Sequence, residues 1–422
     1  MDKNKSQVLI LTRHPLTGRM LSAKLSNDLH CETVLVNSLT QASDVLTQSG
    51  RRFSVAVCEL SIPDGTAEHV VEMMKGAAIP VIAIASVYSE ELSESLFKSG
   101  VVDFVLKDSP NVMQYVSDLV HRIIVNATTK VLLVDDSNTW RQVLKFYLLQ
   151  QNLQVLTAND ADQALQILEQ HPDTKLMITD FEMPKINGDE LVFEVRKKFN
   201  KGELAIIGIS GSSDGKISAR FLKSGANDFI NKPFFYEEIF CRVSQNLEMI
   251  ELIESNQNAA TRDFLTGLYN RRYFFDKGEK ALKLCIEKKH ALALAIIDID
   301  HFKNVNDQFG HDWGDLALKN TAQQMNQFFS GDLCARLGGE EFALLFTDKT
   351  EQQIAQDLEA FRAHQEHHPL MYLDGRLIEV KVSIGWVMLE TGDAPLKLNE
   401  LIKLADVKLY QAKHKGRNRI EL

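Results

Sequence analysis

The sequence predicts two doubly wound α/β domains with parallel sheets, followed by a third domain of the α+β class. The chain has 422 residues, and this length suggests about three domains. Residues 98–107 are echoed by residues 223–232, about one domain length further along the chain. In both copies short apolar strands alternate with helical patterns, which is typical of doubly wound parallel sheets. The last third instead contains two apolar runs joined by Gly338-Gly339, and this pattern predicts a β-hairpin.

The composition favours a cytoplasmic protein. Hydrophobic residues make up 45% and charged residues 25% of the chain, as in soluble globular proteins. The five cysteines are odd in number and form no CxxC pair, which favours reduced thiols in a cytosol. No apolar run approaches the roughly 18 residues that span a bilayer, and the N-terminus has no signal-peptide pattern, so we expect no membrane insertion. The net charge of −10 counts against nucleic acid as a partner.

Polar residues follow the predicted strands of the second copy. The strands and the residues that follow them are 131–134 before Asp135 and Asp136, 176–179 before Asp180, 206–209 before Ser210, and 229–231 before Lys232. Because the carboxyl ends of parallel strands meet at one edge of the sheet, these side chains should converge. Like charges ~4 Å apart repel by about 4 kcal/mol at an effective dielectric constant of 20. We therefore expect a cation and a lysine among the three carboxylates.

This arrangement resembles the receiver domain of two-component response regulators, which has a flavodoxin-like fold. The resemblance implies that Asp180 is the phosphoryl acceptor and that a cognate histidine kinase or phosphotransfer protein is a partner. The implied ligands of a Mg²⁺ ion are Asp135, Asp136, Asp180 and the backbone carbonyl of Glu182. The resemblance also implies that Ser210 and Lys232 contact the phosphoryl oxygens, and that Phe229 is an aromatic switch residue.

The first copy departs from this pattern at its strand ends. Its first strand, residues 8–11, is followed by Thr12-Arg-His14 instead of an acidic pair. Glu59 stands at the acceptor position, because a proline follows it at the same distance as in the second copy. Ala85 replaces the hydroxyl residue, while Lys107 is retained. We expect a degenerate receiver without a Mg²⁺ site, acting as an adaptor or dimer surface; the alternative is a fixed Glu59–Lys107 ion pair that imitates the phosphorylated state.

A helix is expected to leave the second copy. Residues 236–258 contain no Pro or Gly, and apolar residues recur at helical spacing at positions 239, 240, 243, 247, 250 and 253. We predict that this stripe forms a partly self-associating stalk; the alternative is that it packs only on its own sheet. The predicted domains are residues 1–126 and 127–250, then the linker-helix end at 251–262 and the third domain at 263–422.

Two stretches of the third domain place acids beside bare backbone. Arg336-Leu-Gly-Gly-Glu-Glu-Phe342 puts Glu340 and Glu341 at the turn of the predicted hairpin. Residues 291–297 predict a buried strand, which is followed by Asp298. The two glycines permit positive φ and leave no side chain to hold a ligand away from the backbone. Carboxylates in this setting suit a divalent cation that carries a phosphorylated ligand.

These stretches resemble the GGDEF family, the diguanylate cyclases, in the variant spelling Gly-Gly-Glu-Glu-Phe. Further signatures of the family follow in the same order as in its members. The opening signature begins at Asp263, and the closing signatures cover residues 382–385, 405–413 and 416–418. The resemblance implies a palm-like α+β fold with the order β-α-β-β-α-β and the hairpin beside the first strand. It implies that two GTP molecules condense to cyclic di-GMP with release of two pyrophosphates. Because each subunit holds one GTP, it also implies a homodimer.

The resemblance assigns roles to individual residues. Asp298, the carbonyl of Ile299 and Glu340 are the implied ligands of Mg²⁺ (or Mn²⁺), and Glu340 is also the implied general base. Lys303 is implied to stabilise negative charge at the transition state. The implied substrate contacts are Asn306, His311 and Asp315 for the nucleoside, and Lys413 and Arg417 for the terminal phosphates.

One segment departs from the family pattern. Many members carry an inhibitory product site, Arg-x-x-Asp; here Phe329 stands in place of the arginine, and Asp332 is retained. A doubly anionic product would lack its bidentate partner, so the sequence argues against product inhibition at this site. Separately, His364, His367 and His368 lie in a polar segment without a nearby cysteine, and we expect a solvated loop there, not a metal site.

Two other function classes stay open from the sequence alone. One is a non-enzymatic response regulator whose third domain binds GTP or a protein partner. This class predicts that Glu340→Ala leaves the function unchanged. The other is a nucleic-acid-binding regulator, for which the sequence has no helix-turn-helix signature and no basic patch.

Overall fold

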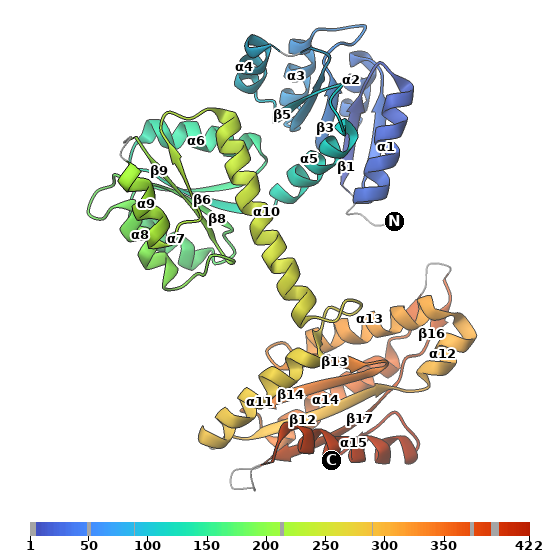
Figure 1. Ribbon diagram of the computed structural model, residues 1–422. Coiled ribbons are helices and arrows are strands. Elements are labelled where there is room, and N and C mark those ends of the chain that lie inside the picture. The colour runs from blue at the N-terminus through green and yellow to red at the C-terminus, as the bar shows by residue number, and fades with distance from the viewer. Residues whose placement is uncertain are drawn as a thin grey trace. The chain divides into compact units, whose positions relative to one another are not determined.

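The structure is a computed structural model that describes residues 6–48, 52–87, 89–211, 215–288, 290–371, 375–389 and 396–422. The chain forms two compact units, Met1–Glu254 and Ser255–Leu422. The first unit contains two five-stranded sheets, and the second contains a six-stranded sheet (Figure 1). Within the described part of the chain, no helix combines the length and apolar character needed to cross a bilayer.

The first sheet is parallel, with the strand order β2-β1-β3-β4-β5. Its strands are β1 (Gln7–Leu11), β2 (Glu32–Val36), β3 (Phe53–Glu59), β4 (Val81–Ala85) and β5 (Asp103–Leu106). Its helices are α1 (Pro15–Leu29), α2 (Leu39–Thr47), α3 (Ala67–Gly76), α4 (Glu90–Ser99) and α5 (Val112–Asn126). Because crossover helices cover both faces of such a sheet, its central strands are apolar on both sides. Val8 and Ile10 of β1 accordingly join one buried cluster, and Leu9 and Leu11 join another.

The second sheet repeats this topology, with the strand order β10-β9-β8-β6-β7. Its strands are β6 (Lys130–Val134), β7 (Gln154–Ala158), β8 (Leu176–Asp180), β9 (Ala205–Ser210) and β10 (Asp228–Asn231). Its helices are α6 (Asn138–Gln150), α7 (Ala161–Gln170), α8 (Gly188–Arg196), α9 (Gly215–Ser224) and α10 (Tyr236–Thr261). The prediction of two doubly wound, flavodoxin-like sheets is confirmed.

Helix α10, which follows β10, contacts both domains of the first unit. The Tyr236 hydroxyl donates a hydrogen bond to the carbonyl of Val102 at 2.8 Å. Further along, Nη1 of Arg122 on α5 lies 2.6 Å from Oε1 of Glu251 on α10. Tyr236 is buried together with the apolar residues of α5. One side of α10 therefore packs against the first domain.

The predicted stalk is a helix, but its apolar stripe is not available for self-association. Ile239, Val243, Leu247 and Ile250 are buried in the core of the second domain, and Phe240 is buried against the first domain. The prediction of a self-associating stripe is therefore wrong for these residues, because they are already buried within one chain. The alternative of packing on the helix's own sheet accounts for four of them.

The second unit has a mixed sheet with the order β11-β13-β14-β12-β17-β18 and a separate β15-β16 pair. Its strands are β11 (Tyr269–Asn270), β12 (Leu292–Ile299), β13 (Leu333–Gly338), β14 (Glu341–Thr347), β15 (Leu370–Met371), β16 (Leu377–Ile378), β17 (Val382–Leu389) and β18 (Ile420–Glu421). Its helices are α11 (Arg271–Lys288), α12 (Phe302–Phe309), α13 (His311–Phe328), α14 (Glu351–His367) and α15 (Leu398–His414). The hairpin strand β14 pairs with β12, so the predicted α+β fold and its β-α-β-β-α-β order are confirmed.

Two buried clusters cover the two faces of this sheet. One contains apolar residues of α13 and α14, and the other contains those of α11 and α15. Gly385 of β17 allows α15 to approach closely, since a Cβ there would lie 2.0 Å from the backbone nitrogen of Leu409. The predicted loop at the histidines is wrong, because His364 and His367 belong to α14. His367 and His368 are nevertheless exposed to solvent, and the ring centroids of His364 and His368 lie 3.8 Å apart.

Candidate functional site

Three carboxylates meet at the carboxyl edge of the second sheet. Asp180 ends β8, and Asp135 and Asp136 follow β6, the neighbouring strand. Carboxylate oxygens of the three residues lie within 4.8 Å of one another. The ammonium of Lys232 donates to Oδ2 of Asp135 at 2.9 Å and to Oδ1 of Asp180 at 3.0 Å. The three acids and the lysine therefore converge as the strand pattern predicts.

Lys232 alone does not balance the negative charge of this cluster. Asp135 and Asp180 are buried. Burial raises the pKa of Asp180 above its ordinary value; Lys232 opposes this effect, and the charge of Asp135 adds to it. A set of oxygen donors with surplus negative charge suits a hard divalent cation such as Mg²⁺. The residues at this edge therefore fit a magnesium site.

The other predicted receiver residues border the same edge. Ser210 ends β9 and is buried, and its carbonyl accepts a hydrogen bond from the backbone N–H of Lys232 at 2.8 Å. Glu182 is exposed in the loop that follows Asp180. Phe229 of β10 is half-buried, and its ring centroid lies 5.6 Å from that of Phe221 on α9. Ser210 and Glu182 thus adjoin the acid cluster in the chain, and Phe229 packs on α9.

The matching edge of the first sheet holds one fully paired acid. Glu59 ends β3 and is 3% exposed. Its carboxylate accepts a hydrogen bond from the Thr12 hydroxyl at 2.8 Å and another from the Lys107 ammonium at 3.1 Å. Burial raises the pKa of Glu59, but the hydrogen bonds from Thr12 and Lys107 outweigh burial and leave the pKa below its ordinary value. Ala85, which ends β4, offers no hydroxyl.

In the second unit, the acids of the hairpin face the end of β12. Strands β13 and β14 pair as far as Glu341, so Gly339 and Glu340 form the turn. Glu341 lies opposite Asp298 in the ladder between β14 and β12. The N–H of Ile299 donates to the carbonyl of Glu340 at 3.4 Å. Gly339 has a φ of 52°, a left-handed conformation that glycine adopts readily.

Asp298 is a buried acid with one basic partner. It lies within β12, not after it as the sequence predicts, and it is 5% exposed. Burial raises its pKa to about 6; Lys413 opposes this effect, while Glu340 and Glu341 add to it. The ammonium of Lys413, in the last turn of α15, lies 2.8 Å from Oδ2 of Asp298. Because Glu340 and Glu341 face this pair, negative charge exceeds positive charge at this end of β12.

The predicted nucleoside contacts lie on helices α12 and α13. Asn306 is half-buried on α12, where Lys303 is exposed, and His311 and Asp315 are exposed at the start of α13. A Cβ added to Gly314 would lie 2.0 Å from Oδ1 of Asn306. Gly314 therefore makes room for the Asn306 amide, a role that the residue pattern alone does not reveal.

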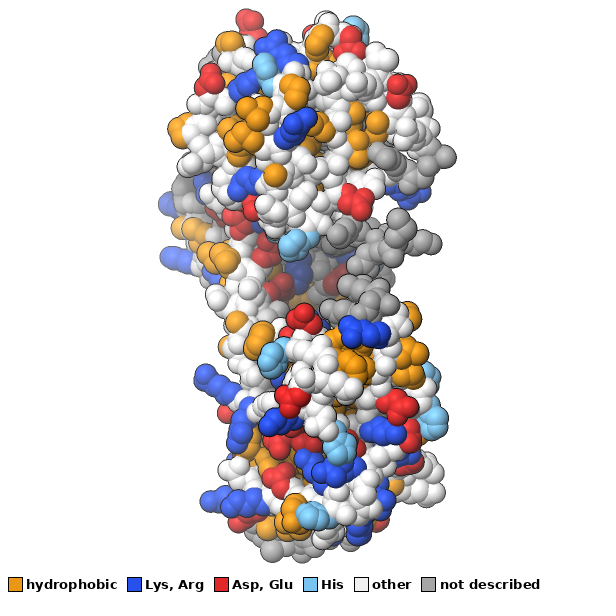
Figure 2. All heavy atoms as spheres, turned by 90° about the vertical axis from the view of Figure 1, so that its right-hand side faces the viewer, with side chains coloured by type: hydrophobic (Ala, Val, Ile, Leu, Met, Phe, Trp, Pro, Cys, Tyr) orange, Lys and Arg blue, Asp and Glu red, His pale blue; other side chains and the backbone are white. Residues whose placement is uncertain are grey.

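Charges of both signs are mixed on the surface of the second unit. On the face that Figure 2 shows, Lys and Arg side chains lie among Asp, Glu and His side chains in the lower part of the view. A nucleic-acid backbone is bound by a concentrated positive field. The mixed charges on the face that Figure 2 shows offer no such concentrated field there.

Arg336 holds the turn of the hairpin. Its guanidinium donates to the carbonyl of Gly339 at 2.9 and 2.7 Å, and to Oδ1 of Asp263 at 3.0 Å. Burial raises the pKa of Asp263, but hydrogen bonds from Thr266 and Arg336 outweigh burial and lower it. The sequence identifies Asp263 only as the first residue of a signature. Its contact with Arg336, 73 residues further along the chain, cannot be seen in the sequence pattern.

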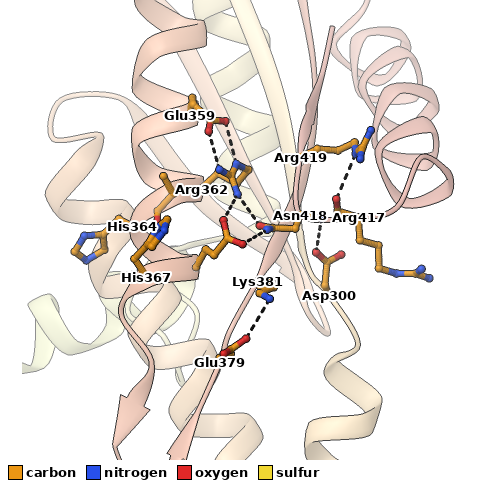
Figure 3. A network of polar contacts seen from close by, with 12 residues as sticks. Asp300, Glu359, Arg362, His364, His367, Glu379, Lys381, Arg417, Asn418 and Arg419 are labelled. Atoms are coloured by element: carbon orange, nitrogen blue, oxygen red, sulfur yellow. Dashed lines mark hydrogen bonds and ion pairs between the residues drawn. The ribbon is translucent and has the colours of Figure 1, made fainter.

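A polar network holds the segment that follows α15 (Figure 3). The Asn418 side chain donates to Oε1 of Glu366 at 2.7 Å and accepts from Nη1 of Arg362 at 2.8 Å. The backbone N–H of Asn418 donates to Oδ2 of Asp300 at 2.9 Å. The other oxygen of Asp300 accepts the Ser383 hydroxyl at 2.7 Å. Three elements, α14, β17 and the segment after β12, thereby meet at Asn418.

This network fixes the backbone next to Arg417, a predicted phosphate contact. Arg417 and Asn418 have φ values of 62° and 45°, which are uncommon for residues other than glycine. The Arg417 side chain extends away from the network in Figure 3. Arg362, Glu366 and Asp300 were missed in the sequence because they show no local pattern; only the folded chain brings them to Asn418.

Phe329 and Asp332 have structural partners. Phe329 is 1% exposed, with ring centroids 5.3 Å from Phe361 and 5.8 Å from Phe346. The ammonium of Lys349 lies 2.8 Å from Oδ2 of Asp332. The residue that stands in place of the inhibitory-site arginine is therefore part of the core, and the retained acid is already paired.

The fold and the two acid sites together define a class: a receiver module joined to a GGDEF module. The sequence model of the family described as "Diguanylate cyclase, GGDEF domain" matches residues 260–419, and that of the "Response regulator receiver domain" matches residues 131–244. A crystal structure described as that of a two-component system response regulator/GGDEF domain protein is 40% identical, with a TM-score of 0.54, and the match covers 58% of this chain and 100% of that chain. The chain belongs to the family of two-component response regulators that carry a GGDEF domain.

Two curated relatives extend the comparison. The response regulator PleD of Caulobacter vibrioides is 28% identical over 301 residues, which cover 69% of this chain and 65% of PleD. The chain thus spans slightly less than two thirds of the length of that relative. The probable diguanylate cyclase DgcT of Escherichia coli (strain K12) is 37% identical over 169 residues, which cover 39% of this chain and 36% of DgcT.

Proposed function

We propose that this chain is a diguanylate cyclase regulated by phosphorylation of its second receiver domain. In this reaction two GTP molecules condense to cyclic di-GMP and release two pyrophosphates. The 3′-hydroxyl oxygen of each GTP forms a bond to the α-phosphorus of the other, and the bond from that phosphorus to pyrophosphate breaks. The observation that carries the proposal is the buried Asp298 facing the Glu340 turn, within a segment that matches the GGDEF family over residues 260–419.

Asp298, the carbonyl of Ile299 and Glu340 would hold Mg²⁺ or Mn²⁺ in the cyclase site. The cation, when bound, neutralises charge on the triphosphate and polarises its oxygens. Glu340 lies at the turn, half-buried, and is suited to take the proton of the attacking 3′-hydroxyl. Lys303 carries an exposed ammonium that can stabilise charge developing on the phosphoryl oxygens.

Lys413 is suited to exchange partners when substrate binds. Its ammonium pairs with Asp298 in the structure. The terminal phosphates of GTP would offer this ammonium a new anionic partner and would free Asp298 to act as a cation ligand. Arg417, held in place through Asn418, would bind the same phosphates as a planar, bidentate donor. We assign these two residues to the triphosphate.

Asn306, His311 and Asp315 are assigned to the nucleoside. Guanine presents an N1–H and an amino group side by side, which an acid such as Asp315 can accept. The Asn306 amide can both donate and accept, and Gly314 leaves it space. Because Asn306 is half-buried while the other two residues are exposed, we assign the base edge to Asn306 and Asp315.

Synthesis requires two subunits in this proposal. One site binds one GTP, and each 3′-hydroxyl must reach the α-phosphorus of the partner nucleotide. A homodimer that holds two half-sites face to face converts an encounter into an effectively intramolecular reaction. Control of dimer formation or geometry would then control the rate.

Asp180 is the proposed phosphoryl acceptor, served by a histidine kinase or a phosphotransfer protein. Asp135, Asp136, Asp180 and the Glu182 carbonyl would hold Mg²⁺, and Ser210 and Lys232 would contact the phosphoryl oxygens. The first domain is proposed to be a degenerate receiver, since Glu59 is paired with Lys107 and Thr12. A paired acid without acidic neighbours at its strand end has neither the free carboxylate nor the cation that phosphoryl transfer needs.

Product analysis tests the proposal. The purified chain is incubated with GTP and Mg²⁺, with and without beryllofluoride as a phosphoryl analogue, and the nucleotides are separated by chromatography. We expect cyclic di-GMP and pyrophosphate, in larger amounts with beryllofluoride, and no product from Glu340→Ala. Absence of cyclic di-GMP under both conditions would rule out the cyclase. Equal synthesis with and without beryllofluoride would rule out regulation through the receiver.

A further inference from the structure

The first domain contains a cavity of about 240 Å³ beside Glu59. It lies between the sheet and helices α1 and α5. Its apolar lining includes Ile10, Val57 and Ile84 from the strands, Leu21 from α1, and Met113 and Val116 from α5. Thr17, Lys107 and Glu59 add polar groups to the lining. A dry apolar cavity of ~150 Å³ can already bind benzene, so this one has room for a bicyclic ring.

The second domain carries two aromatic rings at sequence positions that correspond to part of this lining or adjoin it. Trp140 on α6 and Phe234 after β10 pack with ring centroids 5.3 Å apart. The ammonium of Lys232 lies 5.2 Å from the Trp140 ring centroid. Trp140 follows the end of β6 at the same interval at which Thr17 follows the end of β1. The first domain therefore carries a small side chain where its sister domain carries an indole.

The first domain also has a small side chain where the second domain has Phe234. Phe234 is two residues beyond Lys232, and the residue two beyond Lys107 is Ser109. The first domain thus lacks both rings but keeps the lysine above them. Lys107 lines the cavity of the first domain, whereas Lys232 lies over the Trp140 ring of the second domain. Among its described residues, the first domain therefore has the lysine but no aromatic ring beneath it.

The polar end of the cavity favours an uncharged occupant. Lys107 is paired with Glu59, which also accepts the Thr12 hydroxyl, so these charges are already balanced. Asp108, also in the lining, is exposed and adds negative charge, which disfavours an anion. The ammonium of Lys107 can still lie over the face of an aromatic ring, as that of Lys232 does in the second domain.

We propose that this cavity binds a small, uncharged, planar aromatic molecule about the size of indole, with its ring between α1 and α5 and its face toward Lys107. The first domain is then a ligand-binding module, with Thr17 and Ser109 at the positions that Trp140 and Phe234 occupy in the second domain. The proposal is independent of the cyclase reaction and of phosphorylation at Asp180.

Calorimetric titration of the full-length chain with indole tests this proposal. We expect saturable binding of one indole per chain. Thr17→Trp restores the side chain of the sister domain, and Met113→Trp fills the cavity from the opposite wall. Either change should weaken binding by roughly tenfold or more, because the introduced ring and indole would need the same space. Met20→Trp is the matched control, because Met20 is 56% exposed on α1, and it should bind indole like the unmodified chain.

A second measurement does not depend on any variant. In the chain labelled at methionine methyl groups, indole should shift the methyl resonance of Met113, which lines the cavity, and leave that of Met20 unchanged. Lack of saturable binding at low millimolar indole overturns the proposal. So does equal binding by folded Thr17→Trp, or a saturable titration in which the Met113 resonance does not move.

Discussion

The two parallel-sheet domains carry an acid at the same strand end but in opposite electrostatic states. Glu59 is held by Thr12 and Lys107 and has a lowered pKa. Asp180 shares its lysine with Asp135, and its pKa is raised. The same fold therefore holds one acid whose charge is balanced within the protein and one whose charge needs a further cation. The difference lies in the neighbouring residues, since Thr12 and Arg13 stand in the first domain where Asp135 and Asp136 stand in the second.

Asp298 and Asp300 of the second unit show a similar difference in surroundings, although they are only two positions apart in the chain. Asp300 is buried, and both its oxygens accept hydrogen bonds, from Ser383 and from Asn418. Asp298 is equally buried, but Glu340 and Glu341 face it and its pKa is raised to about 6. Asp300 has neutral hydrogen-bond donors on both oxygens, whereas Asp298 has one lysine and two facing acids. An acid in surroundings of the second kind is a candidate for ligand binding. This distinction can be tested by removing one charge at a time.

The largest effect should come from Asp298→Asn compared with Asp300→Asn. We expect Asp298→Asn to lower kcat for cyclic di-GMP synthesis by roughly 10²–10³-fold, because the cation loses a ligand. Asp300→Asn should instead lower the free energy of unfolding by ~1–3 kcal/mol, since a buried hydrogen-bonded acceptor is disturbed. Chromatographic rates at saturating GTP and urea denaturation measure the two quantities. Equal losses of kcat in both variants would contradict the distinction.

Asp180→Asn and Glu59→Gln extend the comparison to the two receiver-like domains. With acetyl phosphate as donor, we expect Asp180→Asn to incorporate no phosphoryl group, and Glu59→Gln to be phosphorylated like the unmodified chain. Glu59→Gln should lower the free energy of unfolding by about 1–3 kcal/mol, because Lys107 loses its charged partner in a buried site. Mass spectrometry and urea denaturation report these outcomes. Phosphoryl transfer to Asp180→Asn would show that another residue is the acceptor.

The sequence alone predicts the parts of both sites that depend on strand ends. Asp135, Asp180 and Lys232 were placed correctly because parallel strands align their carboxyl ends at one edge. The hairpin at Gly339-Glu340 was placed correctly because its signal is local. Both predictions need only the order of elements along the chain, and not the way in which distant surfaces meet.

Contacts between distant segments could not be predicted in this way. Arg362 and Asn418 are 56 residues apart, and neither belongs to a periodic pattern that points to the other. The apolar stripe of α10 was visible, but its partners were not. Phe240 packs on the first domain and Ile239 on the second, and a pattern of apolar positions shows only that a face is buried.

The pH dependence of stability should differ in sign between Asp298, whose pKa is raised, and Glu59, whose pKa is lowered. Because folding raises the pKa of Asp298 from 3.8 to about 6, its stabilising contribution is present below pH 3.8 and is lost as the pH rises through about 6. Without divalent cations, Asp298→Asn should therefore be more stable than the unmodified chain above pH 6, by ~1–3 kcal/mol. The advantage should disappear near pH 4.

Glu59 should behave in the opposite way. Its pKa is lowered from 4.5, so its contribution is present above pH 4.5 and is lost as the pH falls through the lowered value. Glu59→Gln should be less stable than the unmodified chain at pH 7, and the difference should shrink in acid. Urea denaturation in EDTA from about pH 2 to pH 8 measures both variants, because the Glu59 contribution is lost only below pH 4.5. A common pH trend for the two would refute the electrostatic contrast.

The smallest effect is expected at the network around Asn418 (Figure 3). Arg362→Ala removes the donor to Asn418 and leaves Glu366 without its basic partner. Because Arg417 is then held less firmly, we expect KM for GTP to rise by about threefold to tenfold while kcat changes less, as when a ground-state binding contact is lost. Lys381→Ala is the matched control, since its pair with the exposed Glu379 should contribute less than about 1 kcal/mol.

Steady-state rates over a range of GTP concentrations separate the two parameters. A rise in KM for Arg362→Ala, with Lys381→Ala unchanged, would assign the network to positioning of the triphosphate contact. Partial recovery in Arg362→Lys would sharpen this assignment, because lysine restores the charge beside Glu366 but not the planar fork that reaches Asn418. If kcat falls and KM stays constant, Arg417 acts in the chemical step and not in binding.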